Sequence, residues 1–322
     1  MQYTLQNVPN VYLDRSPVMV NSLWNFLKRI FGTECAWDAM TLARVGIDPA
    51  TARSLTRVLQ PVHTVRLRPE PAEPEEARMT APLKLSWHGI TDPGLVRDHN
   101  EDNFAFLDLG IRTLFVVADG MGGHDAGEVA SGIAVETVAQ AVRTGRVPNR
   151  DPLAAVTQSV QQANAAVKKE ALRKGSNMGT TLTVALVEDG IAHIASVGDS
   201  RLYWMENGSI TQVTKDHSLV AKLVELGKLT KEEARTDPRS NLLLRTIGSE
   251  ESVTVDTYRI PLARGGSLVL CTDGLWGELD DDEIRGICAG EQYTELSCAR
   301  LVQRANANGG KDNITAIVVK VV

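Results

Sequence analysis

Three short apolar runs in this 322-residue chain each lead to an aspartate, and no other feature constrains the fold as much. The runs lead to Asp119, Asp199 and Asp273. Each run is rich in Val, Leu, Ile or Ala and is bounded by turn residues, which is typical of a buried strand. A carboxylate at the end of such a strand lies at the rim of the core. The pattern therefore predicts sheets that bring several carboxylates to a shared cleft.

The simplest alternative is that these aspartates form tight turns. Asp-Gly is a common turn signal, because glycine tolerates positive φ and aspartate bonds the turn backbone. Asp119 and Asp273 are each followed by glycine, so either pair alone fits a turn. Asp199 and Asp312 are not followed by glycine, and a turn requires no apolar run before it. The whole set therefore favours a functional group of carboxylates.

Glu101 and Asp102 add further acidic residues to this group. Gathered carboxylates repel one another unless cations neutralise them. The sequence has no Cys-x-x-Cys pair and no His pair at i, i+4, which argues against zinc. All-oxygen ligation favours Mg²⁺ or Mn²⁺, and two such ions can activate water for attack on a phosphoryl group. Arg97 is a candidate phosphate ligand, because its planar fork matches phosphate geometry, although an ordinary surface arginine fits the spacing equally well.

A second phosphatase pattern is present near the C-terminus. Cys298 and Arg304 formally fit the Cys-x5-Arg pattern of cysteine-based phosphatases. That chemistry requires a curled loop whose backbone amides face the phosphate. The stretch 293–307 has no glycine and has helical periodicity, so it predicts a helix. We therefore expect no cysteine nucleophile here.

The predicted elements come in blocks. They are strands at 84–90, 103–108 and 112–118, helices at 127–143 and 152–173, and strands at 181–187, 191–197, 201–205 and 209–213. Short turns such as Glu188-Asp189-Gly190 join consecutive strands, which is typical of antiparallel hairpins. The adjacent helices then need sheet faces to cover. The sequence therefore predicts an α+β fold with two packed antiparallel sheets and helix pairs outside.

Six segments between about Leu85 and Val322 share a further pattern. They are Asp92–Asp102, Val117–Glu128, Met178–Thr181, Val197–Arg201, Cys271–Trp276 and Gly310–Thr315. In this order they resemble the motifs of the metal-dependent serine/threonine protein phosphatases of type 2C. The resemblance implies a four-layer α-β-β-α sandwich, with a metal cleft at one end between the sheets. It also implies that residues 218–248, which we call the flap, lie beside the site.

The resemblance assigns two Mn²⁺ or Mg²⁺ ions to this cleft. It implies that Asp119 bridges the two ions and that the Gly120 carbonyl binds one of them. Asp273 and Asp312 are implied to complete the shell of the other ion.

Other residues of the motifs have implied roles around these ions. Glu101 and Asp102 act mostly through metal-bound waters, and Asp199 belongs to a third metal position seen in bacterial members. Arg97 holds the phosphate. Many eukaryotic relatives carry a histidine directly after the bridging Asp-Gly, where this chain has Met121. His124 is then the candidate proton donor, the alternative being a hydrogen-bonding residue of a glycine-rich loop.

The resemblance implies hydrolysis of phosphoserine and phosphothreonine in proteins by a water activated between two metal ions. In a bacterium such an enzyme opposes a Ser/Thr kinase, and stand-alone members include some encoded beside type VI secretion genes. Small phosphate esters are an alternative substrate. Another alternative is a catalytically inactive phospho-sensing module, which predicts loss of a metal carboxylate, yet Asp119, Asp273 and Asp312 are all present.

Composition restricts the partners and the location. The net charge is −6 and the basic residues are scattered, which argues against nucleic acid as a partner. No stretch approaches the ~18 apolar residues of a membrane span. The four cysteines show no framework spacing, which is typical of reduced thiols in the cytoplasm. We expect a cytoplasmic monomer whose partner is a phosphoprotein substrate.

The chain divides at a stretch rich in proline and glutamate. Residues 68–80 are the predicted linker, residues 1–67 an N-terminal extension of unknown function, and residues 81–322 the catalytic domain. Between Val20 and Phe31 apolar residues recur at helical spacing, which favours a helix packed on another helix over one docked on a partner or membrane. An alternative is that translation starts at Met79.

Overall fold

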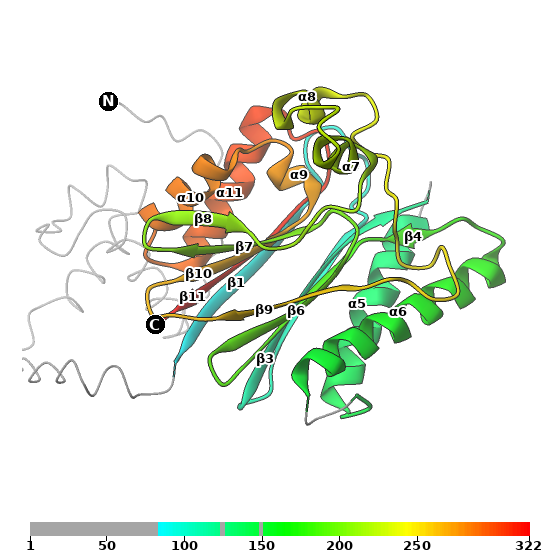
Figure 1. Cartoon of the computed structure of the whole chain (residues 1–322), viewed down its shortest axis with the longest axis horizontal. Coiled ribbons are helices and arrows are strands. Elements are labelled where there is room, and N and C mark those ends of the chain that lie inside the picture. Colours follow the sequence, from blue (N-terminus) through cyan, green and yellow to red (C-terminus); the bar gives the residue numbers. More distant parts are fainter. Residues whose placement is uncertain (1–82, 123–125, 148–150) are drawn as a thin grey trace, which may run out of the picture. The chain divides into compact units, whose positions relative to one another are not determined.

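The computed structural model describes residues 83–122, 126–147 and 151–322. The predicted extension (1–67) and linker (68–80) lie outside the described residues, and so does His124. The described chain forms two antiparallel sheets with helices against the outer face of each (Figure 1). The predicted α+β class and four-layer α-β-β-α sandwich are therefore confirmed. Within these ranges, none of the helices combines the length and the apolar character needed to cross a bilayer.

The first sheet, called here the β11 sheet, has the strand order β1-β11-β10-β7-β8. Its strands are β1 (Leu85–Asp92), β7 (Arg201–Glu206), β8 (Ser209–Gln212), β10 (Ser267–Cys271) and β11 (Ile314–Val321). β10 and β11 are antiparallel, and Cys271 lies opposite Ala316. The end of β10 and the start of β11 are therefore side by side. Because Asp273 follows β10 and Asp312 precedes β11, the topology brings these two carboxylates together.

The second sheet, called here the β3 sheet, has the order β2-β3-β5-β6-β9, and β4 pairs with β3. Its strands are β2 (Asp102–Asp108), β3 (Arg112–Met121), β4 (Gly179–Thr180), β5 (Leu182–Glu188), β6 (Ile191–Val197) and β9 (Asp256–Pro261). In the β2–β3 pair Asp102 lies directly opposite Asp119. One hairpin of this sheet therefore supplies two of the predicted site carboxylates.

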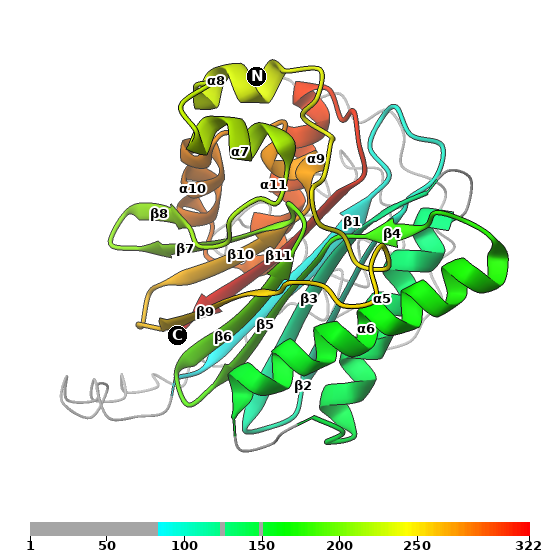
Figure 2. The ribbon, with the colours of Figure 1, turned by 45° about the vertical axis from the view of Figure 1, so that its right-hand side comes forward.

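Two pairs of helices cover the outer faces (Figures 1 and 2). The β3 sheet is covered by α5 (Ala126–Arg143) and α6 (Pro152–Lys174), and the β11 sheet by α10 (Asp281–Gly290) and α11 (Thr294–Asn308). Local sequence sets the ends of α6, because the Asp151 side chain accepts hydrogen bonds from the first turn and Gly175 adopts φ 61° after the last. Such an N-cap and a left-handed glycine are the usual terminators of a helix.

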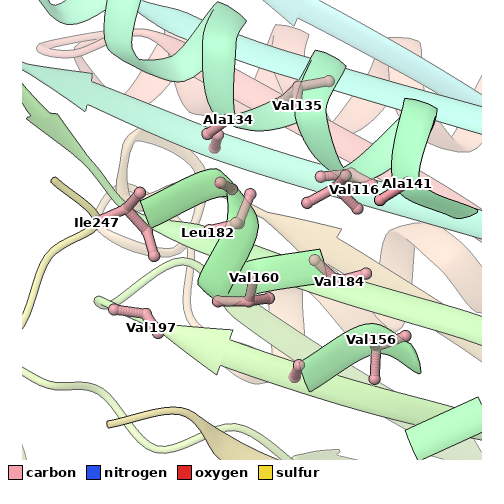
Figure 3. Packing of buried hydrophobic residues seen from close by; sticks show 14 of the residues in the cluster. Val116, Ala134, Val135, Ala141, Val156, Val160, Leu182, Val184, Val197 and Ile247 are labelled. Atoms are coloured by element: carbon pink, nitrogen blue, oxygen red, sulfur yellow. The ribbon is translucent and has the colours of Figure 1, made fainter. Parts of the chain in front are cut away.

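The core consists of apolar layers between these elements. Figure 3 shows Val116 and Val184 of the β3 sheet packed with Val135 of α5 and Val160 of α6. Phe115, the neighbour of Val116 on β3, points into the other layer, between the two sheets. Both faces of β3 are therefore buried, which explains why its sequence is a continuous apolar run instead of an alternating one.

The flap (218–248) contains the short helices α7 (Leu219–Glu225) and α8 (Lys231–Thr236). Both helices lie at the same end of the sandwich as α9 (Asp273–Trp276), as the two views agree (Figures 1 and 2). Arg235 of α8 donates hydrogen bonds to the carbonyls of Trp276, Gly277 and Leu279. The flap is therefore tied to the segment that begins with Asp273.

Candidate active site

The predicted acidic residues meet at one end of the sandwich, where strands of both sheets end. Asp102 and Asp119 come from the β2–β3 hairpin, and Asp273 and Asp312 flank the β10–β11 pair. Their charges are close enough to act on one another. Burial raises the pKa of Asp119 well above its usual value, and the carboxylates of Asp273, Asp102, Asp199 and Asp312 raise it further. This end of the fold is therefore a concentrated negative site.

Asp102 is a fully enclosed member of the cluster. Its side chain is buried, and its Oδ2 accepts hydrogen bonds from Thr272 Oγ1 at 2.7 Å and Thr315 Oγ1 at 2.6 Å. Burial raises its pKa well above the usual value, although these two hydrogen bonds lower it. Within the described structure its Oδ1 is buried without a hydrogen-bond partner. An unpaired buried acceptor of this kind needs a cation or a donor.

Asp119 and Asp273 form the centre of the cluster. The Asp119 backbone N–H donates to Thr181 Oγ1 at 2.9 Å, which fixes the end of β3. Burial and the charge of Asp312 raise the pKa of Asp273 to about 6, while a side-chain hydrogen bond with Asp119 lowers it. Asp273 Oδ1, like Asp102 Oδ1, is buried with no hydrogen-bond partner among the described residues.

Close backbone contacts bring Glu101 and Gly120 to the same place. Glu101 Oε1 accepts a hydrogen bond from the Gly127 N–H at 3.1 Å, and the Gly120 N–H donates to the Glu101 carbonyl at 3.2 Å. A Cβ atom on Gly120 would lie 2.1 Å from the Gly127 carbonyl oxygen. Only glycine therefore allows the end of β3 to approach the start of α5. Burial raises the pKa of Glu101.

Arg97 lies on the loop between β1 and β2, at the edge of the cluster. Its guanidinium donates to Asp312 Oδ2 at 2.6 Å. The Arg97 side chain is 47% exposed and that of Asp312 is 30% exposed, so both remain accessible from solvent. The predicted phosphate ligand and the predicted metal ligand are therefore brought together.

Asp199 follows β6 and is buried. Burial raises its pKa well above the usual value, and the charge of Asp273 adds to this. The indole N–H of Trp276 donates to the Asp199 carbonyl at 3.0 Å. The structure therefore places Asp199 in electrostatic contact with the cluster, on the side of α9.

The cluster is not arranged as a finished ligand set. Within the described parts of the chain, no three His, Cys, Asp or Glu side chains converge closely enough to hold a metal ion. Side-chain pairing explains this: Asp312 is turned to Arg97, and Asp119 is bonded to Asp273. The charges of the carboxylates nevertheless act on one another, which places them at the same end of the fold.

The family model described as Protein phosphatase 2C matches residues 96–318. The chain belongs to the protein phosphatase 2C family. It is 37% identical over 235 residues to the serine/threonine phosphatase stp of Listeria welshimeri serovar 6b. This match covers 71% of this chain and 93% of that protein. The chain is therefore a protein-serine/threonine phosphatase.

Solved structures support the same assignment for the fold. The catalytic domain of the serine/threonine protein phosphatase PstP, solved in complex with two manganese ions, matches with a TM-score of 0.67 and 34% identity over 74% of this chain and 99% of that one. PppA, described as a key regulatory component of the type VI secretion system in Pseudomonas aeruginosa, matches with a TM-score of 0.63 and 31% identity over 74% of this chain and 98% of that one.

Within this protein phosphatase 2C domain, three supporting residues are absent from the sequence prediction. Thr272 and Thr315 hold Asp102, and the Asn313 side chain accepts a hydrogen bond from the Glu101 N–H at 2.8 Å. Asn313 also donates to the carbonyls of Pro93 and His99, which orders the loop that carries Arg97. All three residues lie within three positions of predicted aspartates in the motifs, and that position is the signal that points to them.

The structure supports the exclusion of a cysteine nucleophile in this phosphatase. Cys298 lies within α11 and is buried. Burial raises the pKa of its thiol to about 12, and its Sγ contacts the His88 carbonyl at 3.3 Å. A protonated thiol enclosed in the core cannot attack a phosphate ester.

Proposed function

We propose that this phosphatase hydrolyses phosphoserine and phosphothreonine in proteins with two Mn²⁺ or Mg²⁺ ions held by the carboxylate cluster. When bound, such ions ionise water next to phosphorus and stabilise the charge on the phosphoryl oxygens. The observation that carries the proposal is the pair of buried carboxylate oxygens, Asp102 Oδ1 and Asp273 Oδ1, which lack a hydrogen-bond partner in the described structure. The cluster fits hard cations, because its donors are oxygens and burial raises the pKa of its carboxyl groups.

Asp119 is the proposed bridging ligand. Its position opposite Asp102 and its hydrogen bond to Asp273 support this, since it is the carboxylate in contact with both halves of the cluster. The Gly120 carbonyl is the proposed backbone ligand to one ion. Asp273 and Asp312 are the proposed ligands to the other.

Three further carboxylates lie around this proposed pair. Glu101 and Asp102 are held by the Gly127 N–H and by threonine hydroxyls, respectively. They are therefore proposed to act mostly by binding metal-coordinated water. Asp199, on the side of α9, is the proposed ligand of a third ion. The manganese complex of the similar PstP domain supports the choice of metal.

Arg97 is the proposed phosphate ligand. It is paired with Asp312, and both side chains are partly exposed. A substrate phosphate would take the place of the Asp312 carboxylate on the guanidinium, and Asp312 would then be free to bind a cation.

Arg97→Lys should lower kcat/KM for a phosphopeptide by about tenfold, mainly through KM, because lysine keeps the charge but loses the two-pronged contact with phosphate. Steady-state kinetics with saturating Mn²⁺ measures this. Arg173→Lys is the matched control, since Arg173 is an exposed arginine on α6 that pairs with Glu170. Equal kinetics for Arg97→Lys and the wild type would remove Arg97 from the site.

The physiological setting is a second part of the proposal. We infer that the enzyme opposes a bacterial Ser/Thr kinase, because the substrates of such a phosphatase are the products of such kinases. The similarity to PppA of Pseudomonas aeruginosa, described as a regulator of type VI secretion, favours a role in that pathway.

Phosphate release from a phosphothreonine peptide, with Mn²⁺ present, tests the proposed activity directly. We expect release from the phosphothreonine peptide and much less from the same peptide carrying phosphotyrosine. Binding of the peptide without any release would instead support the phospho-sensing module. Equal release in Mn²⁺ and in excess chelator would contradict the metal-dependent mechanism.

A further inference from the structure

His217 lies where the flap meets the turn that carries Asp199. Its side chain is 6% exposed. The residue directly precedes the flap, and its backbone carbonyl accepts the Leu244 N–H at 2.7 Å, near the end of the flap. Ser218 and Leu243 form a β-bridge at the same place. Both ends of the flap therefore close on His217.

His217 also forms hydrogen bonds, through its backbone and its ring, with the turn that carries Asp199. The His217 N–H donates to the Gly198 carbonyl at 2.9 Å, and the Gly198 N–H donates to His217 Nδ1 at 3.1 Å. Gly198 has φ 102°, and a Cβ there would lie 2.6 Å from the Thr181 side chain. The turn is thus compressed between His217 and the threonine that holds Asp119. His217 and Gly198, the residue before Asp199, are therefore joined by two hydrogen bonds.

The other ring nitrogen faces an ion pair. His217 Nε2 lies 3.4 Å from Asp256 Oδ2 and 3.2 Å from an Arg245 nitrogen, and Arg245 donates to Asp256 Oδ1 at 2.7 Å. Because Nδ1 accepts the Gly198 N–H, the neutral ring carries its proton on Nε2, directed at Asp256. Burial, followed by the charge of Arg245, lowers the pKa of His217 and favours this neutral form.

Neighbouring contacts also connect the segment that carries His217 to the segment that carries Asp199. Arg201 forms a two-pronged pair with Asp216, the residue before His217, and stacks 3.6 Å above the Trp276 ring. Trp276 in turn donates to the Asp199 carbonyl. The segment that carries His217 and the segment that carries Asp199 are therefore fastened together on two sides.

We propose that His217 is a positioning residue that couples the flap to Asp199, by accepting the Gly198 N–H on Nδ1 while its Nε2–H is held by Asp256. This inference rests on the proposed function, because Asp199 as a cation ligand is itself proposed. When the flap ends are closed on His217, the Asp199 carboxylate is held in place to bind a cation. When they separate, His217 loses the Leu244 contact that restrains it, and its hold on the Gly198 turn weakens.

Two substitutions separate the two ring contacts. In His217→Asn the amide oxygen occupies the place of Nδ1 and can accept the Gly198 N–H, but the side chain is too short to reach Asp256. In His217→Gln the amide can reach Asp256, but no acceptor lies at the place of Nδ1. His193→Gln is the control, because His193 is a buried histidine on β6 whose strand partners are Arg259 and Leu186.

We expect His217→Gln to raise the Mn²⁺ concentration for half-maximal activity by about tenfold, as loss of a contact that orients a ligand typically does. His217→Asn should cause a smaller rise, because it keeps the contact with Gly198 and loses only the one with Asp256, and His193→Gln should stay close to the wild type. Hydrogen exchange in chelator gives a second readout, with faster exchange of the Gly198 amide in His217→Gln than in His217→Asn. Identical behaviour of the Asn and Gln variants, whether both impaired or both normal, would reduce His217 to a packing residue and overturn the proposal.

If the variants do not fold, hydrogen exchange in the wild type still tests the role of His217. Added Mn²⁺ should slow exchange at the Gly198 and Leu244 amides together, and protection of one without the other contradicts the coupling. The two proposals fail in different ways. Absence of Mn²⁺-dependent activity in the wild type would refute the proposed function. Hydrogen exchange of the Gly198 and Leu244 amides in chelator tests the role of His217 without any metal.

Discussion

Asp119→Asn is expected to lower phosphopeptide hydrolysis by about 10³-fold or more, since the proposed bridging ligand serves both ions. Asparagine has the same shape but carries no negative charge. The loss should appear in kcat, because the substrate phosphate still meets Arg97. Rates measured at saturating Mn²⁺, with p-nitrophenyl phosphate as a second substrate, determine whether the chemistry itself has been lost.

The chain offers a matched control for this substitution. Asp189 lies in the β5–β6 turn with φ 50°, a conformation that asparagine also tolerates, and it is exposed on the surface. Asp189→Asn should therefore keep full activity. An Asp119→Asn enzyme with activity near that of Asp189→Asn would exclude Asp119 as a bridging ligand and remove the basis of the two-metal mechanism.

Much of the fold follows from local sequence signals, because hairpins and capped helices are local structures. The apolar runs before Asp119 and Asp199 are strands, and α6 starts and ends at the residues that a proline, an N-cap and a glycine indicate. The pattern does not predict β4, since this strand has two residues and depends on pairing with β3. Nor does it predict β9, an edge strand whose residues alternate between half-buried and exposed.

The candidate site is predictable to a different degree. Its acidic residues are visible in the sequence because each lies at or near the end of a strand. The residues that orient these carboxylates are not visible, since they act through contacts between distant parts of the chain. Thr315 bonds Asp102 over 213 positions, and His217 bonds Gly198 across the β7–β8 hairpin. The pairing of Arg97 with Asp312 likewise arises from the three-dimensional approach of a loop to the start of β11. Sequence thus identifies the reactive groups, and the fold identifies what orients them.

Removal of the metal should change stability as well as activity. In the folded chain burial, followed by the charge of Asp273, raises the pKa of Asp119 above its usual value of 3.8. The folded state therefore binds this proton more tightly than the unfolded chain does, so the contribution of Asp119 to stability is present below about pH 3.8 and is lost as pH rises. At neutral pH without metal, the ionised cluster opposes folding.

Bound cations should offset the repulsion among the ionised carboxylates and so stabilise the fold. We expect Mn²⁺ at about one hundred times its dissociation constant to raise Tm by about 5–10 °C relative to chelated protein, since one ion at that level adds about 2.7 kcal/mol. In chelator at neutral pH, Asp119→Asn should melt above the wild type, because the substitution removes one charge from the cluster. With Mn²⁺ added, the wild type should gain stability and the variant much less. Thermal melts of both proteins, with Asp189→Asn as control, measure this reversal of order. Two outcomes would contradict this prediction: a wild-type Tm that does not change with Mn²⁺, or a chelated Asp119→Asn that is less stable than the wild type. Either would mean that repulsion among the carboxylates is not relieved by a bound cation.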